Sequence, residues 1–468
     1  MSDHKLLING VLRDGARHID VVNPATGAAF ATCPVADLAL LDEAVAAAKA
    51  AFPAWSARPL ADRAGLLTRL ADAMQARAAE FGRLLTLEQG KPLDQAGMEI
   101  MGAIFTLRAF AGMKLDPVVQ KDDAKGKVVE IRRPLGVVAA ITPWNYPVML
   151  LMNKLGPALL AGNTVVAKPA PTTPLTSLLF GALCAEILPP GVVNIICDEN
   201  DLGQALTSHP NVAKVSFTGS TATGRKVMQA AAATLKRVTL ELGGNDAAIV
   251  LDDVDPIATA RKIFQGAMAN AGQVCVVIKR AYVPEMMYDI FCDELTRLAQ
   301  AAVVDDGSRQ GTQIGPVQNR AQFEKLKALL ADSARDGKIA AGGTALDREG
   351  FFIAPTIVRD VTDDAAIVRD EQFGPVLPVL KYTDLDEVVE RANASDYGLG
   401  GSVWGTDEER AADVAARLQS GTIWVNQHLA LSPMIAFRGA KQSGMGAELG
   451  LDGLKEYTQA AILNIKRG

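Results

Sequence analysis

Three side chains, far apart in the sequence, could together carry out acyl-transfer chemistry. Cys275 ends the motif GQVC, Glu241 lies in LELGG, and Asn145 lies in PWNYP. A thiolate is a strong nucleophile, a carboxylate can act as general base on water, and an amide can donate a hydrogen bond to a developing oxyanion. The set predicts a site that forms a thioester and then hydrolyses it.

Each of these residues also has a structural interpretation. A free cysteine such as Cys275 usually behaves as a small buried hydrophobe. Glu241 could be a solvent-facing residue of an edge strand, although the end of a strand in an open α/β sheet is also where ligands bind. Asn145, between two prolines, could be selected for turn geometry alone. The functional interpretation therefore depends on the three occurring together.

Two further segments could contact a phosphate or a sugar. The run Phe217-Thr218-Gly219-Ser220 ends a predicted strand and begins a predicted helix, whose free N–H groups could hold a phosphate. It matches neither the GxGxxG fingerprint nor a P-loop. Lys168 ends another predicted strand and could equally be a solvated terminus. Because the histidines have no metal-ligand spacing, we expect no metal site; they are His4, His18, His209 and His428.

The elements that must position these residues alternate between short apolar runs and helical patterns. The predicted strands cover residues 137–141, 164–167, 192–196, 212–217 and 238–242. The predicted helices between them cover residues 149–160, 176–187, 201–208 and 223–232. This βαβ rhythm predicts an α/β fold with a doubly wound parallel sheet.

Other segments predict a helical cover, a second α/β region and two unpaired strands. Ala-rich helical patterns at 41–52 and 59–89 could cover one face of the first sheet. The second region has apolar strands at 247–251 and 376–380, and helices at 256–268, 288–303 and 321–333. Half-exposed strand patterns at 127–133 and 461–466 fit neither region, and we expect them to pair with another subunit.

Composition limits the class of protein and its partners. The chain has 468 residues, of which 49% are hydrophobic and 21% charged, with a net charge of -6. These values predict a globular chain of two or more domains that binds neither nucleic acid nor membrane, so its partner is a small molecule. Its five scattered cysteines, without a CxxC pair, predict a reducing compartment, and we expect the cytoplasm.

Seven motifs, taken in order, resemble the aldehyde dehydrogenase superfamily: PWNYP, GNTVVAKP, FTGS, LELGG, GQVC, EQFGPV and KQSG. The resemblance covers nearly the whole chain. It implies a dinucleotide-binding domain (1–120 and 137–243), a catalytic domain (244–441) and a small β oligomerisation element (121–136 and 442–468). The implied assembly is a homodimer or homotetramer.

The resemblance also implies roles for individual residues. The nucleophile, the general base, the oxyanion donor and a pair that aids proton exit are Cys275, Glu241, Asn145, and Glu448 with Lys154. The implied cofactor contacts are Trp144, Lys168, Phe217, Gly219, Ser220, Gly243, Glu371 and Phe373. By analogy, the substrate tunnel includes Tyr146, Leu150, Asn153, Val274, Val276, Ile435 and Phe437.

The implied reaction is NAD(P)-dependent oxidation of an aldehyde to a carboxylic acid through a cysteine thiohemiacetal and thioester. Family members that pass the acyl group to coenzyme A generally lack the glutamate at position 241, so its presence favours hydrolysis. A cofactor-binding scaffold without catalysis is a further alternative, but it has no need for the complete catalytic set.

Two departures from the family pattern bear on specificity. The usual KPSE is Lys168-Pro169-Ala170-Pro171 here, so the acid that commonly grips the adenosine ribose is missing. Acidic residues at 198–199 could restore discrimination against a 2'-phosphate; we expect NAD and leave NADP open. Ala436-Phe437-Arg438-Gly439 replaces PFGG. The mostly apolar tunnel predicts an aliphatic or aromatic aldehyde, while Arg438 makes a semialdehyde the alternative.

Overall fold

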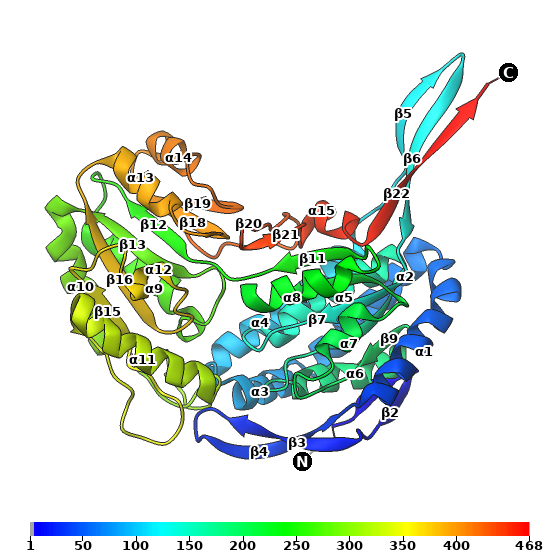
Figure 1. The fold of residues 1–468 in the computed structure, drawn as a ribbon, viewed down its shortest axis with the longest axis horizontal. Coiled ribbons are helices and arrows are strands. Elements are labelled where there is room, and N and C mark those ends of the chain that lie inside the picture. The colour runs from blue at the N-terminus through cyan, green and yellow to red at the C-terminus, as the bar shows by residue number, and fades with distance from the viewer. Residues whose placement is uncertain (1–3, 468) are drawn as a thin grey trace.

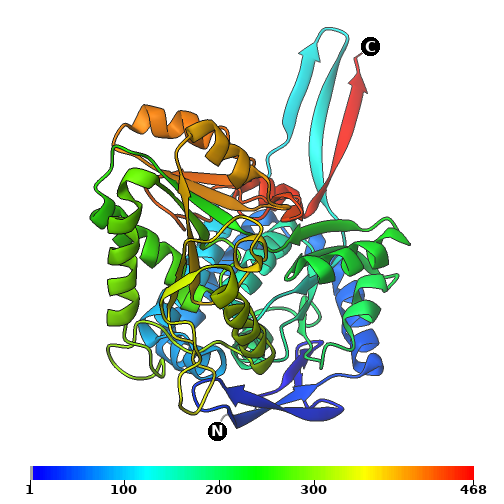
Figure 2. The same ribbon diagram turned by 60° about the vertical axis from the view of Figure 1, so that its left-hand side comes forward.

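Two α/β bodies lie side by side, and a narrow three-stranded sheet extends away from them (Figure 1). The structure is a computed structural model that describes residues 4–467. Turning the molecule shows the same projecting arm from another side (Figure 2). The α/β class predicted from the alternating pattern is confirmed.

The first body is built on an eight-stranded sheet with the order β2-β1-β9-β8-β7-β10-β11-β21. Strands β7 to β11 are mutually parallel, β21 and β1 run antiparallel to their neighbours β11 and β9, and β2 forms the other edge by pairing antiparallel with β1. The strands are β1 (Leu6–Ile8), β2 (Val11–Arg13), β7 (Val137–Ile141), β8 (Thr164–Lys168), β9 (Val193–Ile195), β10 (Val212–Thr218), β11 (Arg237–Glu241) and β21 (Gly444–Met445). The strand order reverses between β7 and β10, which is where open α/β sheets bind their ligands.

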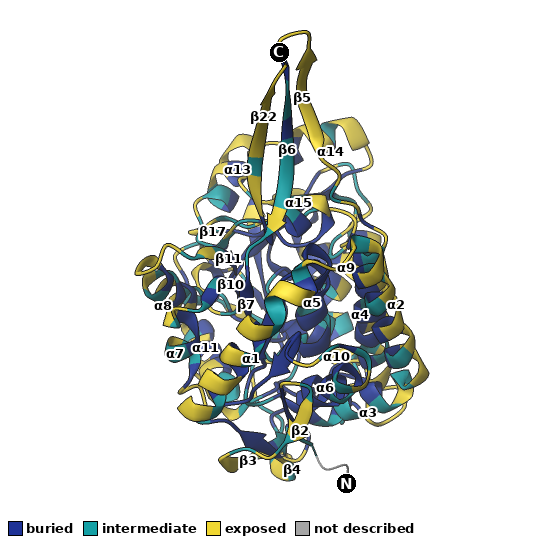
Figure 3. Cartoon of the chain, turned by 90° about the vertical axis from the view of Figure 1, so that its right-hand side faces the viewer, coloured by how far each residue is buried: buried dark blue, intermediate teal, exposed yellow. Residues whose placement is uncertain are grey.

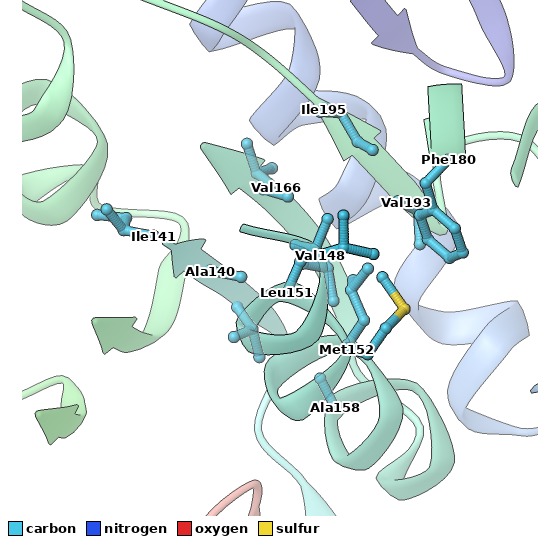
Figure 4. Packing of buried hydrophobic residues seen from close by; sticks show 14 of the residues in the cluster. Ala140, Ile141, Val148, Leu151, Met152, Ala158, Val166, Phe180, Val193 and Ile195 are labelled. Atoms are coloured by element: carbon cyan, nitrogen blue, oxygen red, sulfur yellow. The ribbon is translucent and has the colours of Figure 1, made fainter. Parts of the chain in front are cut away.

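The central strands are buried on both faces, which explains their continuous apolar sequences. All five residues of β7 and all five of β8 are buried. Their side chains pack with α5 (Pro147–Ala161) and α6 (Leu175–Ile187), and Figure 4 shows Val148, Leu151 and Met152 among them. Helix α5 begins with Pro147 in its first turn and ends at Gly162, whose φ is 96°.

The helices before β7 form more than one layer. Helix α1 (Leu38–Ser56) packs directly on β7, β8 and β9, as expected for a helix that covers the sheet. The predicted segment 59–89 divides into α2 (Leu60–Ala76) and α3 (Ala78–Gln89), which pack with α4 (Leu93–Ala111) against α5 and α6. The prediction that this segment covers the sheet itself was wrong, because α5 and α6 already occupy that face and are themselves buried on both sides.

The second body contains a seven-stranded sheet with the order β14-β15-β16-β13-β12-β18-β19. Only β14 runs antiparallel to its neighbour. The strands are β12 (Asp246–Val250), β13 (Ile278–Pro284), β14 (Lys338–Ala341), β15 (Thr356–Arg359), β16 (Val376–Tyr382), β18 (Gly400–Trp404) and β19 (Thr422–Val425). Helices α9 (Pro256–Met268), α10 (Tyr288–Ala301) and α11 (Arg320–Asp336) match three of the predicted helices.

The projecting arm is a sheet with the order β22-β6-β5. Strand β6 (Gly126–Pro134) pairs antiparallel with β22 (Thr458–Lys466) along its whole length, and its other side pairs with β5 (Val118–Asp123). The two strand patterns found in the sequence therefore pair with each other, and because β5 and β22 leave open outer edges, the expected pairing with another subunit stays a prediction. Figure 3 shows the two outer strands exposed along most of their length.

Shorter elements complete the chain. They are β3 (Arg17–Asn23), β4 (Ala28–Val35), α7 (Gly203–Ser208), α8 (Thr221–Ala232), η1 (Ala269–Gly272), η2 (Glu285–Met287), α12 (Ala366–Arg369), α13 (Leu385–Asn393), β17 (Tyr397–Gly398), α14 (Glu408–Ala415), β20 (Ala440–Lys441) and α15 (Gly450–Lys455). Within residues 4–467, no helix combines the length and apolar character needed to cross a membrane.

Candidate active site

Four strands of the first sheet bring polar side chains to one edge. Because β7, β8, β10 and β11 are parallel, their carboxyl ends lie together. Lys168 pairs in register with the last residue of β7, and Glu241 pairs with Thr218 at the end of β10. Asn145 follows in the turn between β7 and α5. These side chains, distant in the sequence, therefore lie along the same edge of the sheet, on both sides of its switch point.

The proposed nucleophile lies in a strained turn that enters the second sheet. Asn270, Ala271 and Gly272 all have positive φ values, of 50°, 55° and 69°, directly before the Cys275 segment. A side chain at Gly272 would place its Cβ 2.0 Å from the Gly374 carbonyl oxygen, so only glycine fits there. Conformations of this kind persist only where the surrounding structure enforces them, and they cluster at functional sites.

Cys275 differs from the other cysteines in its access to the surface. It is half-buried, whereas the side chains of the other four are buried. Burial raises the pKa of the Cys275 thiol well above its usual range, the negative charge of Glu241 raises it further, and the Lys279 ammonium opposes both effects. These surroundings favour the protonated thiol, and the positive charge of Lys279 acts in the opposite direction, toward the thiolate that a nucleophilic cysteine requires.

Glu241 is a buried carboxyl group without the partners that buried acids normally have. Glu241 is 5% exposed, and within the described chain the only hydrogen-bonding group that acts on its carboxylate is the neighbouring Cys275 thiol, which lowers its pKa. Burial raises the pKa of Glu241 to about 8, with a further contribution from the negative charge of Glu448. The free lone pairs and a pKa near neutrality suit Glu241 to accept a proton from water.

Asn145 is held by hydrogen bonds on both its backbone and its side chain. Its carbonyl oxygen accepts from Lys91 Nζ at 2.9 Å and from Asn270 Nδ2 at 3.1 Å, and its Nδ2 donates to the Gln273 carbonyl at 2.9 Å. The contact with Gln273 places the amide beside the segment that leads to Cys275. A side-chain amide has two hydrogens, so the second one remains for an oxyanion.

Lys154 and Glu448 form a buried ion pair behind Glu241. Lys154 Nζ lies 2.5 Å from Glu448 Oε1 and donates to Thr218 Oγ1 at 2.7 Å. The charges of Glu448 and Lys154 shift the Glu241 pKa in opposite directions, so the three groups act on one another. The structure thus brings Lys154 and Glu448, predicted together for proton exit, to the same site.

The end of β10 and the start of α8 form a cradle of the kind that holds a phosphate. Ser220 is the N-cap of α8, with its Oγ accepting from the Thr223 N–H at 3.2 Å. At Gly219, an added Cβ would lie 2.6 Å from the buried Phe217 ring, and the Gly219 N–H donates to the Glu241 carbonyl at 3.0 Å. The backbone is therefore held open beside a helix N-terminus, where anions bind.

A second group of predicted cofactor residues gathers around Glu371. Glu371 Oε1 accepts from the Gly244 N–H at 3.0 Å, and an added Cβ at Gly243 would lie 2.5 Å from Glu371 Oε2. Phe373, at a φ of 55°, packs edge-on against Trp144 with ring centroids 5.3 Å apart. The absence of a side chain at Gly243 therefore lets the Glu371 carboxylate pack directly against this backbone.

Lys168, at the end of β8, is already paired. Its Nζ lies 2.7 Å from Asp198 Oδ1, both side chains are nearly inaccessible, and Asp198 Oδ2 accepts from the Leu202 N–H at 3.0 Å. Glu199 instead binds Arg17 at the surface. Of the acidic residues considered from the sequence, Asp198 is therefore the one in contact with the predicted ribose position.

The predicted substrate residues fall into different environments. Val274, Val276, Asn153 and Phe437 are buried, Tyr146 and Leu150 are half-buried, and Ile435 is 69% exposed. Phe437 exchanges two backbone hydrogen bonds with Glu448, at 2.7 and 2.9 Å, so it lies beside the buried acid.

A cavity of about 870 Å³ reaches both segments that carry the catalytic groups. Tyr146 and Met149 line it from the α5 side, and Met268 and Ala269 line it from the segment before Cys275. Of the seven residues predicted for the substrate, Tyr146 is the one among its lining residues.

Arg438 does not line this cavity. Its Nη2 is 2.5 Å from Asp452 Oδ2, and both side chains are about half exposed. It lines a different hollow, at the base of the arm, with Arg132 and Arg237. The hypothesis that Arg438 binds a distal carboxylate of the substrate gains no support from this position.

Sequence reasoning missed several residues that hold the site together. Lys91 and Glu99 form a fully buried ion pair 2.5 Å long, and Lys91 also lies 3.6 Å from the centre of the Tyr146 ring. Lys279 donates to the backbone of the nucleophile. The sequence could have indicated Lys279, because a lysine in the apolar run directly after GQVC requires a buried partner. No feature of the sequence indicated the pairing of Lys91 with Glu99.

Comparisons with known proteins agree with this geometry. The family model described as "Aldehyde dehydrogenase family" matches residues 11–463. The protein named Aldehyde dehydrogenase LUC3, from Fusarium sp, is 41% identical over 456 residues, which cover 97% of this chain and 96% of that protein.

Two solved structures are similar over nearly their whole length. The NAD+ complex of an aldehyde dehydrogenase from Bacillus cereus has a TM-score of 0.97 and 35% identity, covering 100% of this chain and 97% of that one. An E. coli NADP-dependent enzyme has a TM-score of 0.96 and 35% identity, covering 99% and 98%. The chain therefore belongs to the aldehyde dehydrogenase family and is an NAD(P)-dependent aldehyde oxidoreductase.

Proposed function

We propose that the protein oxidises an apolar aliphatic or aromatic aldehyde to the carboxylic acid and releases the product by hydrolysis. The observation that carries the proposal is the buried carboxyl group of Glu241, whose only hydrogen-bonding neighbour within residues 4–467 is the accessible thiol of Cys275. A buried acid costs stability unless its charge or its lone pairs are used. Hydrolysis of an acyl-cysteine uses both.

The residues divide the reaction between them. The Cys275 thiolate adds to the aldehyde carbon, and the oxyanion accepts hydrogen bonds from Asn145 Nδ2 and the Cys275 N–H. A bound nicotinamide supplies the acceptor for the hydride that leaves the carbon. Glu241 then takes a proton from water, the water oxygen attacks the thioester carbon, and the Cys275 thiolate departs. We assign proton exit to Glu448 and Lys154.

The same edge of the sheet fits a dinucleotide. Ser220 and the start of α8 would hold the diphosphate, Lys168 and Glu371 the two riboses, and Phe373 would pack near the nicotinamide. Support comes from Ser220 at the N-terminus of α8 and from the Glu371 carboxylate, which accepts from the Gly244 N–H. We propose a preference for NAD, because a 2'-phosphate near Lys168 would meet the negative charge of Asp198.

Asp198→Asn tests this preference. We expect the ratio of kcat/KM with NADP to kcat/KM with NAD to rise roughly tenfold, which corresponds to about 1.4 kcal/mol. Glu199→Gln, which changes a neighbouring acid that binds Arg17 at the surface, is the matched control and should leave the ratio unchanged. An unchanged ratio in Asp198→Asn, or an equal rise in the control, would contradict the proposal.

The large cavity supports an apolar substrate. Its apolar lining residues include Met98, Met149, Phe264 and Met268. Its charged lining residues are Asp94, Glu99 and Arg261. Methionine side chains adapt to irregular apolar surfaces. A cavity of about 870 Å³ is large enough for a bulky ligand.

Absorbance of the reduced cofactor tests the reaction and the substrate class together. A panel of apolar, aromatic and carboxylated aldehydes is offered with NAD and with NADP, and Cys275→Ala serves as the control. We expect the highest kcat/KM with apolar or aromatic aldehydes. A preference for carboxylated aldehydes would contradict the substrate proposal, and activity that survives in Cys275→Ala would contradict the mechanism.

We also propose that the arm joins subunits into a dimer or tetramer. Its outer strands expose apolar side chains, which are Val118, Val119, Ile462, Leu463 and Ile465, and the open edges of β5 and β22 can pair with further strands. Light scattering on the purified protein measures the assembly. A monomer at micromolar concentration would contradict this proposal.

For the cellular location we propose the reducing environment of the cytoplasm. All five cysteines are free, and four of them are buried. A fluorescent fusion located by microscopy would test this, and secretion of the fusion would contradict it.

A further inference from the structure

A lysine is buried inside the second sheet directly after the nucleophile. Lys279 is the second residue of β13, a strand in which every residue is buried, and it is 1% exposed. Burying an ammonium group costs several kcal/mol unless its hydrogens and charge find partners. The partners of Lys279 therefore indicate what the residue is for.

Those partners belong to the active site. Lys279 Nζ donates to the carbonyl oxygen of Val274 at 2.9 Å and to that of Cys275 at 2.6 Å. Its third partner is Glu371, whose Oε1 lies 3.6 Å from Lys279 Nζ. One ammonium group thus connects the backbone on both sides of the thiol to a carboxylate at the predicted cofactor position.

The contact with Val274 fixes the direction of a hydrogen-bond donor. A trans peptide group is planar, and its N–H points away from its C=O. The peptide that joins Val274 to Cys275 is anchored to Lys279 through its oxygen, so the Cys275 N–H is directed to the opposite side. That N–H is the second oxyanion donor in the proposed mechanism, beside Asn145.

The charge of Lys279 acts on the thiol as well. Burial and the negative charges of Glu241 and Glu371 raise the pKa of Cys275, and Lys279 is the positive group that lowers it. Other titratable groups facing the ammonium are Asp246, on β12, and His428. His428 is held neutral, because burial lowers its pKa to about 3, so it adds no positive charge near the thiol.

We infer that Lys279 is a positioning residue for the nucleophile: it orients the Cys275 peptide toward the oxyanion and supplies the positive charge that favours the thiolate. The inference rests on the proposed function, in which Cys275 attacks an aldehyde. Its effect on the thiol itself can nevertheless be measured without aldehyde or cofactor.

The experiment is alkylation of Cys275 by iodoacetamide across a range of pH. In Lys279→Met, which keeps side-chain length and removes the charge, we expect the midpoint of the rate profile to move up by about one pH unit, with a roughly tenfold slower rate below it. Lys279→Arg keeps the charge and should keep the midpoint within a few tenths of a unit. Cys275→Ser identifies the signal, because it lacks the half-buried thiol.

Lys214→Met is the matched control. Lys214 is also fully buried, but it donates to Thr239 and lies 4.0 Å from Glu456, away from the nucleophile. The Lys214→Met variant should have a lower free energy of unfolding than wild type and an unchanged alkylation midpoint. An unchanged midpoint in Lys279→Met, or an equal shift in Lys214→Met, would overturn the inference.

Two further measurements keep the test decisive. If Lys279→Met does not fold, Lys279→Gln replaces it, since glutamine retains N–H donors without the charge, and the same upward shift is expected. Activity is then measured with the best aldehyde: kcat should fall about tenfold or more in Lys279→Met, with a smaller change in KM. A shifted midpoint in a protein that oxidises no aldehyde would overturn the proposed function and leave the role of Lys279 at the thiol intact.

Discussion

Two buried glutamates in different regions of the molecule show how similar burial serves different purposes. Glu88, near the end of α3, accepts hydrogen bonds from the Leu175 N–H at 2.7 Å, the Thr176 N–H at 3.0 Å and the Thr176 hydroxyl. For Glu241, at the end of β11, the only hydrogen-bonding group within the described chain is the Cys275 thiol. Burial raises the pKa of both, to about 7 and about 8.

The difference lies in what the lone pairs do. The carboxylate of Glu88 satisfies free N–H groups at the start of α6, where a negative charge is also favoured by the helix dipole. The carboxylate of Glu241 is desolvated beside a thiol and a second acid, and the Cys275 thiol and the Lys154 charge offset only part of the effect of burial on its pKa. We conclude that Glu88 is part of the scaffold and that Glu241 is kept available for a ligand or water.

The largest expected effect tests whether the Glu241 region is catalytic at all. Removal of the thiol in Cys275→Ala should reduce kcat by at least about 10⁴-fold, since the covalent route is lost. Thermal unfolding should change little, because the thiol makes few stabilising contacts. Activity within tenfold of wild type would mean that the strained turn serves another purpose.

The next effect concerns the base. Glu241→Gln should lower steady-state kcat by about 10²- to 10⁴-fold, because a neutral amide cannot take a proton from water. In wild type, the rate of the hydrolytic step should rise with pH and level off above about 8, as the carboxyl ionises. Stopped-flow and steady-state rates across pH check both, and a wild-type profile in the variant would contradict the assignment.

The oxyanion donor comes third. Asn145→Ala should cost about 10²- to 10³-fold in kcat with a smaller effect on KM, since the lost hydrogen bond forms mainly in the transition state. In Asn145→Asp, a side chain of nearly equal size replaces the donor with an acceptor. Its kcat should be no higher than that of Asn145→Ala. A loss confined to KM would instead indicate a role in ground-state binding.

Glu88→Gln should show the opposite behaviour to Glu241→Gln. One glutamine oxygen cannot satisfy donors that now bind two carboxylate oxygens, so we expect a loss of about 1–3 kcal/mol in the free energy of unfolding. The kcat of the folded protein should stay within about twofold of wild type. Denaturant unfolding measures the free energy of unfolding, and initial rates measure kcat. A large loss of kcat in Glu88→Gln with unchanged stability would contradict the structural role of Glu88.

The last prediction concerns the pH dependence of stability at position 241. The folded-state pKa of about 8 lies above the reference value of 4.5, so the folded protein holds this proton more tightly than the unfolded chain. The contribution is therefore fully present below pH 4.5 and is lost as the pH rises towards 8, by at most about 1.4 kcal/mol per pH unit. Glu241→Gln should match wild type at low pH and gain on it up to about pH 8; a constant difference would contradict this.

Much of the fold could be predicted because local patterns specify it. The strand at Val137–Ile141 and the helix at Pro256–Met268 have the predicted limits, since a continuous apolar run and a Pro-led amphipathic run have few alternatives. The pairing of β6 with β22 could not be predicted, because the register between segments so far apart depends on the folded molecule. The same holds for segment 59–89, whose burial depends on helices that lie between it and the sheet.

In the candidate site too, some features could be predicted from the sequence and others depend on the folded structure. Cys275, Glu241 and Asn145 could be found from the sequence because each lies in a distinctive motif. Asp198 was suspected from its charge, but its contact with Lys168 required the geometry of β8 and the segment after β9. The environment of Arg438 could not be derived, because its partner Asp452 is an exposed residue of a short helix. Motifs thus identify reactive groups, and tertiary contacts decide their specificity.

The most direct test of the central claim is a single-turnover experiment on Glu241→Gln. The variant is mixed with NAD and an apolar aldehyde, reduced cofactor is followed by absorbance, and the protein is then examined by mass spectrometry. The account predicts a burst of about one reduced cofactor per active site and an acyl group on the peptide containing Cys275. The absence of both, or full steady turnover without an acyl adduct, would contradict it.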